Sequence, residues 1–286
     1  MLYKYFSDDA IQYFDDSEYF TLKFTKLEDY NDPYEQSLAV DLAKANFNNV
    51  DYLIGLYQKE IYKCKGYLAT FFSNRPDITP MWAHYGNEQR GFVIAINEKM
   101  LVEYLKDRGL EKISDFKIDN VDYRDGIDSE FQKDFEHHNE RGKGYWYRAV
   151  NEYLLKAFYF FKQDCWKYEE ERRLIIKDNH KILFCKDNNM LLRLPKSCID
   201  YIIFGSKTND IVKEKLQVVF NQPMYEFRIS RSNVESYFID SEIYTYCDIS
   251  KDLVIRVPNC SECGEPIEDS YMNKGMCFWC YARNMD

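Results

Sequence analysis

The sequence lacks a long apolar run, since no stretch approaches the ~20 residues that a membrane helix needs. Its first residues, MLYKYFSDDA, turn acidic at once and are unlike a secretory signal. We therefore expect a soluble, cytoplasmic protein with no membrane partner. In that compartment the nine cysteines are expected to be reduced.

Basic residues are outnumbered, 38 against 48 acidic ones, which gives a net charge of −10. This balance argues against broad electrostatic capture of nucleic acid, so nucleic acid is expected only as a possible substrate. The patterns GxGxxG and GxxxxGK[ST] are absent, which argues against a dinucleotide-binding Rossmann unit and a P-loop. No G-x-S-x-G elbow supports a serine hydrolase.

Strand-like and helix-like runs mix along the chain without a regular βαβ alternation. This mixture predicts an α+β domain with a central, mainly antiparallel sheet and flanking helices, over residues 1–250. The predicted strands are Leu2–Phe6, Tyr19–Phe24, Tyr67–Ser73, Gly91–Ile96, Phe116–Tyr123, Arg172–Ile176, Lys181–Cys185, Met190–Leu194 and Tyr201–Phe204. The predicted helices are Asp51–Tyr62, Glu98–Lys106, a long stretch near Asp128–Gln163, and Asp210–Phe220, with Asn209 as the N-cap of the last.

The C-terminal tail, residues 251–286, contains two CxxC pairs separated by thirteen residues. Each pair forms a tight knuckle that directs two thiolates at one point, which suits a tetrahedral Zn²⁺. Four protein ligands leave no position for water, so this zinc is expected to be structural. Gly264 closes the first knuckle, where a positive φ is often needed. The ligands are Cys260, Cys263, Cys277 and Cys280.

The other five cysteines, Cys64, Cys165, Cys185, Cys198 and Cys247, lie in apolar or aromatic contexts. We expect them to be small core residues. In the tail, Phe278 and Trp279 suit a protein-contacting surface, with packing against the main domain as the alternative.

The densest polar stretch is DCWKYEEERRLII, residues 164–176. If the chain is extended from Trp166 onward, alternation places Glu169, Glu171 and Arg173 on one face. Such a face is costly to bury unless its charges are paired or line a cleft. The alternative is an edge strand whose charges block aggregation.

Three further positions offer polar groups beside apolar strands. Ser73 ends one strand, and His84 stands between aromatic residues in PMWAHYG, where it is either a satisfied structural histidine or part of a cleft. Lys4 interrupts the apolar run LYKYFS, and in NDPYE the Asp32-Pro33 pair predicts a tight turn near Glu35.

The motifs LYKYFS, NDPYE, FFS…MWAHYG…GFVIAI, YRD, WxYExExR and YIIFG occur in this order. Together they resemble an uncharacterised bacterial family, a cytoplasmic domain of unknown function often found near phage-defence and mobile-element genes. The resemblance covers roughly residues 1 to 210.

The layout is also distantly similar to that of ADP-ribosyltransferases. The resemblance implies NAD as substrate. Lys4 and Tyr5 on the first strand and Ser73 on the second would bind NAD, and Glu171 on the third, two residues after Glu169, would be the catalytic carboxylate. That superfamily usually has His or Arg where this chain has Lys4, a point charge without arginine's fork. The resemblance implies a toxin or phage-defence effector.

The remaining roles follow from the same resemblance. Tyr5, Trp82 and Tyr85 would stack on nicotinamide, and Arg173 would contribute to binding NAD. Glu171 would hydrogen-bond the ribose 2′-hydroxyl and offset the positive charge that develops on the ribose, while Glu169 or His84 would act as general base.

Two other readings remain open. In the first, Asp32, Glu35, Glu169 and Glu171 hold Mg²⁺ in a nuclease or other hydrolase, with His84 as base. In the second, the chain is a non-enzymatic module whose zinc tail and aromatic surface bind a protein partner such as an antitoxin or a sensor.

Overall fold

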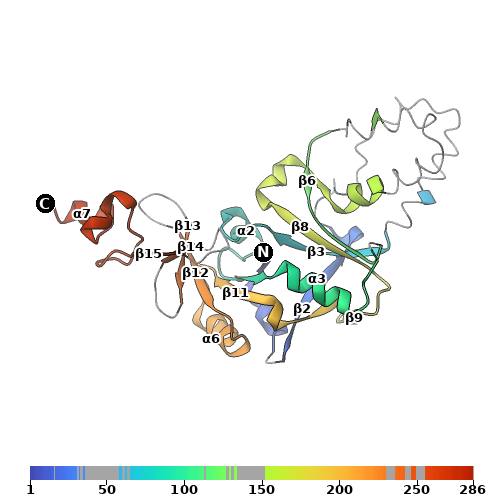
Figure 1. Ribbon diagram of the computed structural model, residues 1–286, viewed down its shortest axis with the longest axis horizontal. Coiled ribbons are helices and arrows are strands. Elements are labelled where there is room, and N and C mark those ends of the chain that lie inside the picture. Colours follow the sequence, from blue (N-terminus) through green and yellow to red (C-terminus); the bar gives the residue numbers. More distant parts are fainter. Residues whose placement is uncertain are drawn as a thin grey trace. The chain divides into compact units, whose positions relative to one another are not determined.

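The computed structural model has an α+β fold with a large, mainly antiparallel sheet and a few helices (Figure 1), as predicted. None of the described helices is long and apolar enough to cross a membrane. The structure describes residues 1–15, 17–30, 32, 35, 58–59, 62, 65–112, 114–126, 129, 132–133, 152–229, 236–241, 246–248 and 255–285.

The chain folds into two compact units that each take more than one segment. Unit 1 contains Met1–Thr21, Phe72–Tyr104 and Leu194–Asp286, and unit 2 contains Leu22–Phe71 and Leu105–Arg193. The cysteine-rich tail groups with unit 1. A separate module beginning at residue 251 stays a prediction.

Unit 1 is built around β1, which pairs antiparallel with β4, and β4 pairs antiparallel with β11. The pairing of β11 with β12 is parallel, and from β12 to β15 the strands form an antiparallel meander. Its elements are β1 (Leu2–Phe6), η1 (Asp8–Tyr13), α2 (Thr79–His84), β4 (Phe92–Ile96), η5 (Lys196–Cys198), β11 (Ile199–Phe204), α6 (Asp210–Val219), β12 (Met224–Ile229), β13 (Ser236–Asp240), β14 (Tyr246–Asp248), β15 (Ile255–Val257), η6 (Asp269–Lys274) and α7 (Phe278–Arg283).

Helix α6 begins at a polar capping residue, Asn209. The Asn209 side chain accepts a hydrogen bond of 2.9 Å from the Val212 N–H, so the predicted N-cap is confirmed. Val212 and Leu216 are buried, and Lys213 forms an ion pair with Glu226 of β12, beside which α6 lies in Figure 1.

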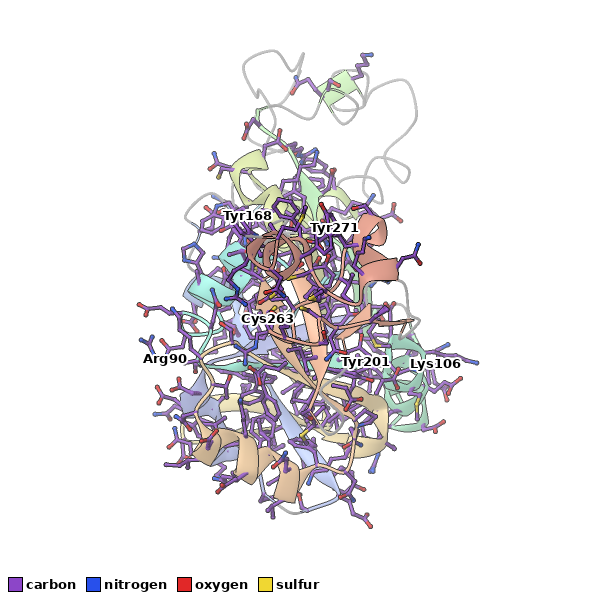
Figure 2. All side chains as sticks on the ribbon, turned by 90° about the vertical axis from the view of Figure 1, so that its left-hand side faces the viewer. Arg90, Lys106, Tyr168, Tyr201, Cys263 and Tyr271 are labelled. Carbon is purple, nitrogen blue, oxygen red and sulfur yellow. The ribbon has the colours of Figure 1, made fainter. Side chains whose placement is uncertain are left out.

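The turn between α2 and β4 has an unusual backbone. Asn87, Glu88 and Gln89 all have positive φ, which non-glycine residues rarely adopt. Gly91 follows where a Cβ would lie 1.9 Å from the Phe6 carbonyl oxygen, so only glycine fits. Arg90 points outward from this turn (Figure 2).

In unit 2, β8 lies between β3 and β5, β3 pairs with β2, and β10 pairs with β9. Residues 152–159 form a helix. The other elements with residues in this unit are β2 (Tyr19–Lys26), η2 (Leu27–Asp29), β3 (Tyr67–Ser73), α3 (Glu98–Asp107), β5 (Phe116–Asn120), β6 (Asp122–Tyr123), β7 (Phe161–Lys162), η4 (Asp164–Glu169), β8 (Glu171–Lys177), β9 (Leu183–Lys186) and β10 (Asn189–Pro195).

Most predicted elements are found within a few residues of their expected bounds, and β1 and β3 match theirs. The predicted helix Asp128–Gln163 is wrong at its end, because Phe161–Lys162 forms β7 and pairs with β6. Most of its earlier part, and most of Asp51–Tyr62, lies outside the described residues.

Candidate functional site

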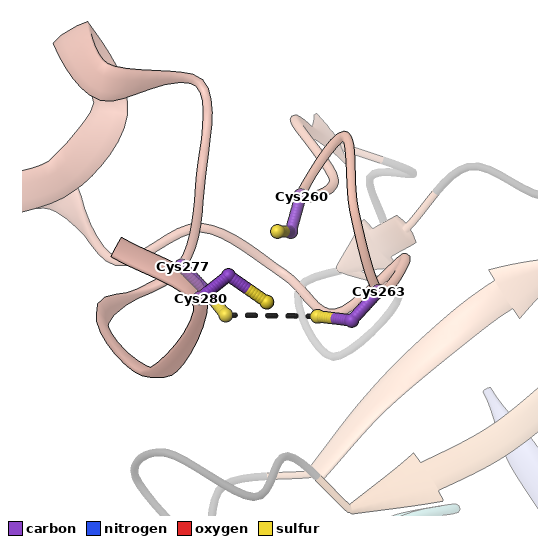
Figure 3. A group of neighbouring side chains, drawn as sticks. All are labelled: Cys260, Cys263, Cys277 and Cys280. Carbon is purple, nitrogen blue, oxygen red and sulfur yellow. Dashed lines mark hydrogen bonds between the residues drawn. The ribbon is translucent and has the colours of Figure 1, made fainter. Parts of the chain in front are cut away.

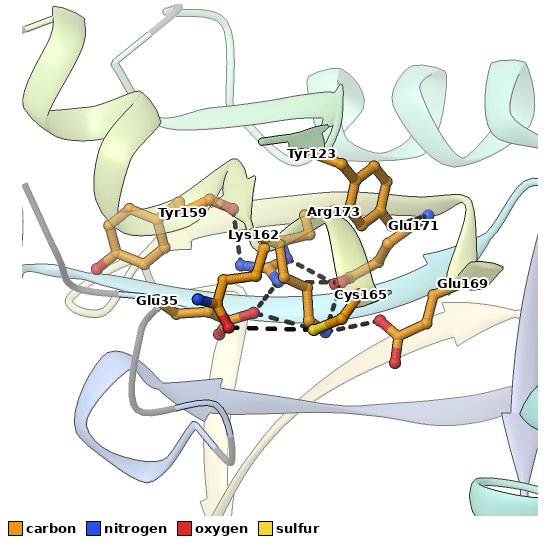
Figure 4. A network of polar contacts seen from close by, with 9 residues as sticks. Glu35, Tyr123, Tyr159, Lys162, Cys165, Glu169, Glu171 and Arg173 are labelled. Carbon is orange, nitrogen blue, oxygen red and sulfur yellow. Dashed lines mark hydrogen bonds and ion pairs between the residues drawn. The ribbon is translucent and has the colours of Figure 1, made fainter. Parts of the chain in front are cut away.

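Five buried, oppositely charged side chains meet in unit 2, and we call them the charge cluster (Figure 4). Their side chains are between 0% and 5% exposed. So little water reaches these charges that each must be compensated by another. The charge cluster consists of Glu35, Lys162, Glu169, Glu171 and Arg173.

Strand β8 places two members on one face. It begins at Glu171, so alternation brings Glu171 and Arg173 to the same side, as predicted. Glu169 reaches the cluster differently: it ends the 3₁₀ helix η4, and Glu170 turns the chain with a left-handed φ of 44°. The expectation of an extended chain from Trp166 is therefore wrong, although the three side chains do converge.

The interpretation of this stretch as a charged edge strand is also wrong. Both sides of β8 are paired, with β3 and with β5, and Asp119 of β5 lies opposite Arg173. A paired strand has no open edge to protect.

Lys162 of β7 places its ammonium among the three carboxylates. Its Nζ lies 2.6 Å from Glu169 Oε2, 3.3 Å from Glu171 Oε2 and 3.6 Å from Glu35 Oε1 (Figure 4). Burial by itself would lower the pKa of Lys162, but the three carboxylates outweigh it, and the net effect raises that pKa. Lys162 is therefore a fixed positive charge at neutral pH.

Arg173 binds Glu171 in a bidentate manner. Its Nε donates to Glu171 Oε1 at 2.6 Å and its Nη2 to Glu171 Oε2 at 3.0 Å. Nη2 also donates to Glu35 Oε1, and Nη1 donates to the Tyr159 carbonyl oxygen at 3.0 Å. This fork fixes the direction of the Glu171 carboxylate.

Aromatic rings flank the same guanidinium. The Arg173 guanidinium carbon lies 5.1 Å from the centre of the Phe71 ring and 5.5 Å from that of Tyr30. At these distances the ring faces attract the cation. The backbone N–H of Glu171 donates to the Tyr123 hydroxyl at 2.7 Å, which anchors the start of β8.

The carboxylates of Glu171 and Glu35 differ in electrostatics. Burial would raise the pKa of Glu171, but Arg173 and Lys162 outweigh it, so that pKa is lowered. For Glu35 burial prevails over Arg173, and the pKa is raised. With three carboxylates against two cations, Glu35 is therefore expected to take up a proton before Glu171 does.

The predicted NAD contacts outside the charge cluster belong to unit 1. Ser73 is fully buried, and its Oγ accepts from the Arg75 N–H at 3.1 Å. Trp82 exposes no surface: it stacks on Phe227 at 5.1 Å and contacts Tyr5 edge-on. In this structure Tyr5 and Trp82 are core side chains, and their role in stacking on nicotinamide stays a prediction.

His84 ends α2 and is exposed, with its ring 6.4 Å from that of Tyr85. It is therefore not a buried structural histidine. The Nζ of Lys4 lies 5.8 Å from the centre of the Phe72 ring. Binding of NAD by Lys4, Ser73 or Tyr85 stays a prediction.

The turn expected at Asp32 is present, because the Glu35 N–H donates to the Asp32 carbonyl oxygen at 3.3 Å. Both side chains are buried. A Mg²⁺ site was expected from Asp32, Glu35, Glu169 and Glu171. The Lys162 ammonium already lies among three of those carboxylates, so Mg²⁺ would have to bind beside it or displace it.

The four tail cysteines converge on one point (Figure 3). Their Sγ atoms all lie within 4.8 Å of one another, and those of Cys263 and Cys277 are 3.6 Å apart. A tetrahedral zinc with Zn–S bonds of about 2.3 Å separates its sulfurs by about 3.8 Å. The four cysteines could therefore bind a metal such as zinc.

The four cysteines differ in electrostatics: the pKa of Cys280 is raised, first by its hydrogen bond to Cys263, whereas that of Cys260 is lowered. Burial tends to raise the pKa of Cys260, but backbone N–H groups at Cys277, Cys263 and Glu262 outweigh it and lower the pKa to about 6. Gly264 has a φ of 75°, as predicted. Ile267 packs with three of the cysteines in a small core of their own.

The prediction for the other cysteines is only partly right. Cys198 is buried, but Cys165 and Cys185 are exposed. Cys165 lies in η4 and Cys185 in the short β9. Cys64 and the Cys247 side chain lie outside what the structure describes.

Sequence reasoning missed Lys162 and the ring of Tyr30. The signal for Lys162 was a lone lysine at the end of the aromatic run FYFF, the same kind of interruption that drew attention to Lys4. Tyr30 carried no such signal beyond its place beside the predicted turn.

A family model described as a protein of unknown function, DUF2971, matches residues 81–174, about a third of the chain. The match includes Lys162, Glu169, Glu171 and Arg173 but not Glu35. It is shorter than the span of residues 1 to 210 expected from the motifs. No curated protein and no solved structure is significantly similar to this chain. About a third of the chain is thus similar to a family whose function is unknown.

Proposed function

We propose that unit 2 carries the catalytic carboxylate of an NAD-dependent ADP-ribosyltransferase-like enzyme. The observation that supports this proposal is the state of Glu171. Its carboxylate is buried, held ionised and fixed in direction by two cations. Preorganised charge of this kind stabilises a developing charge in a transition state.

Glu171 also keeps capacity for a ligand. An ionised carboxylate has about four acceptor positions. Arg173 occupies one on each oxygen, and Lys162 takes a second on Oε2. Among the described residues only Arg173 binds Oε1, which leaves one position that suits the 2′-hydroxyl of a ribose.

In the proposed reaction the bond between the nicotinamide nitrogen and ribose C1′ breaks. Nicotinamide leaves with the electron pair, and a lone pair of the acceptor forms the new bond to C1′. The acceptor's proton passes to a general base, for which Glu169 is the nearest buried carboxylate along the chain. Glu171 offsets the positive charge that builds up on the ribose between these two events.

The test is nicotinamide release from NAD by the purified protein, in buffer without added Mg²⁺. Wild type should release nicotinamide, and Glu171→Gln should be slower by about 10²–10³-fold. Glu111→Gln, at an exposed position, is the matched control and should behave as wild type. All three are compared well below their thermal midpoints.

Absence of release from folded wild-type protein, with RNA and an arginine-rich protein also supplied as acceptors, would sink the proposal. Phosphodiester cleavage that appears only on adding Mg²⁺ would instead favour the metal-dependent hydrolase.

The exposed aromatic residues of the tail support a second candidate, a partner-binding module. Phe278 is 42% and Trp279 57% exposed, which is unusual for such large apolar side chains. A protein partner such as an antitoxin or sensor would bind there. On this reading Glu171→Gln leaves activity in cells unchanged, while Cys277→Ser abolishes it.

We also propose that the tail cysteines hold a structural zinc. All four ligands come from the protein, so none of the coordination is left for water. Mass spectrometry under native conditions should find one zinc per chain, and none after Cys260→Ser.

A further inference from the structure

The Tyr30 hydroxyl is buried and has no hydrogen-bond partner among the described residues. Buried hydroxyl groups are nearly always hydrogen-bonded, to protein or to ordered water, so each exception calls for an explanation. Two other tyrosines beside the charge cluster make such bonds: Tyr123 accepts from the Glu171 N–H, and Tyr159 donates to the Tyr67 carbonyl oxygen.

The Tyr30 ring is held beside the charge cluster. It meets the Phe71 ring edge-on, with the ring centres 5.1 Å apart, and the Arg173 guanidinium lies 5.5 Å from its centre. The same guanidinium binds the Glu171 carboxylate. Tyr30 as a whole is partly exposed, although its hydroxyl is buried.

We propose that the Tyr30 hydroxyl is a substrate-binding group that donates a hydrogen bond to the hydroxyl next to the one bound by Glu171. This inference rests on the proposed function and deepens it. If Glu171 accepts from the ribose 2′-hydroxyl, Tyr30 binds the 3′-hydroxyl. The pair then selects a sugar with two adjacent hydroxyls.

The charges around Tyr30 determine which chemical group fits. Three carboxylates against two cations leave the cluster with an excess negative charge, which disfavours a phosphate or carboxylate ligand there. Both cations already bind carboxylates. Of two adjacent neutral hydroxyls, one can donate to the remaining position of Glu171 and the other can accept from Tyr30.

The protonation state of Tyr30 agrees with a donor role. Burial raises its pKa well above the usual value, and this outweighs the opposing influence of Arg173. The phenol therefore keeps its proton at neutral pH and can donate it.

The experiment uses Tyr30→Phe, with Tyr159→Phe as the matched control. Without NAD, Tyr30→Phe should have a thermal midpoint equal to or above that of wild type, because the hydroxyl it loses is unpartnered. Tyr159→Phe loses a real hydrogen bond and should have a lower midpoint. A midpoint of Tyr30→Phe below wild type would show that the hydroxyl is already bonded, and would overturn the inference.

Nicotinamide release supplies the second readout. We expect the KM for NAD to rise about tenfold in Tyr30→Phe, the effect of one hydrogen bond, with little change in kcat. Wild type should lose a similar factor with NAD lacking the 3′-hydroxyl of its nicotinamide ribose, whereas Tyr30→Phe should not distinguish the two compounds.

The outcomes separate the two proposals. If wild type releases nicotinamide, and Tyr30→Phe has the same KM and the same preference for NAD over the compound lacking the 3′-hydroxyl, the role of Tyr30 is refuted while the proposed function stands. If wild type releases none, both fall together. Only a wild type that is active and selective, paired with an unselective Tyr30→Phe, supports the inference.

Discussion

Replacing Lys162 by methionine isolates the electrostatic contribution of the charge cluster. Methionine keeps much of the length and apolar character of the lysine stem but removes the ammonium, which lies within 3.6 Å of three carboxylates. Arg173 then remains as the only cation against Glu35, Glu169 and Glu171. The cluster changes from one excess negative charge to two.

The magnitude follows from burial. Breaking a buried ion pair by removing one partner costs about 3–5 kcal/mol, because an uncompensated charge stays in the interior. The side chains of the cluster are at most 5% exposed, so solvent and salt screen this effect little. We expect Lys162→Met to lower the free energy of unfolding by this amount at pH 7.

The direction of the pKa shift of Lys162 determines how the loss of stability in Lys162→Met depends on pH. The raised pKa of Lys162 means that its contribution is fully present below the unfolded value of about 10.4 and is lost only as pH rises through the folded value. The difference in free energy of unfolding between wild type and Lys162→Met should therefore be constant from about pH 6 to 9. It should narrow below about pH 5, where protonated carboxylates no longer need the cation.

Urea unfolding at several pH values measures the gap, and Lys117→Met is the control. Lys117 also pairs with a carboxylate, Asp119 at 3.1 Å, and lies 4.9 Å from the centre of an aromatic ring, that of Phe160, but its side chain is 27% exposed. Its loss should cost at most about 1 kcal/mol. Equal effects of the two substitutions, or a gap for Lys162→Met that persists unchanged at pH 4, would refute this reasoning.

Three further predictions concern single sites. Glu171→Gln should destabilise the protein more than Glu35→Gln at pH 7. The lowered pKa of Glu171 stabilises the fold above the pKa that this group has in the unfolded chain, and that stability is lost on acidification. The raised pKa of Glu35 instead favours its neutral form. Urea midpoints of the two variants should converge as pH falls, and unchanged separation would contradict this. Asn209→Ala should cost about 1 kcal/mol through loss of the N-cap, while Asn209→Asp should match wild type in the same assay. Removing the metal with a chelator should expose four additional reactive thiols per chain, and a thiol count that does not change would argue against a metal site.

Local patterns were enough for much of the fold. The all-apolar run of β4 and the run of β1, interrupted only by Lys4, predict strands because most of their side chains are buried. The last strands, β12 to β15, were missed. β14 and β15 have three residues each, too few for a local pattern, and β12 and β13 contain polar residues, so that their pairing partners decide the structure.

The candidate site was predictable only where its members are neighbours along the chain. Glu171 and Arg173 are two residues apart on one strand, so alternation was sufficient. Glu35 is 138 residues from Arg173, and nothing local relates the two. Lys162 depends on β7, whose pairing with β6 replaced the helix that the local pattern favoured.

The division of the chain between the two units has a consequence for fragments and for synthesis. The region matched by the family model, residues 81–174, begins in unit 1 and ends in unit 2. Expressed alone, it would contain β4 without β1 or β11, and only the beginning of β8 without β3, leaving unsatisfied edges that favour aggregation. On the ribosome, β4 lacks its second pairing partner until β11 emerges, a long-range requirement that slows folding. Unit 2, complete at Arg193, is expected to gain resistance to proteolysis first.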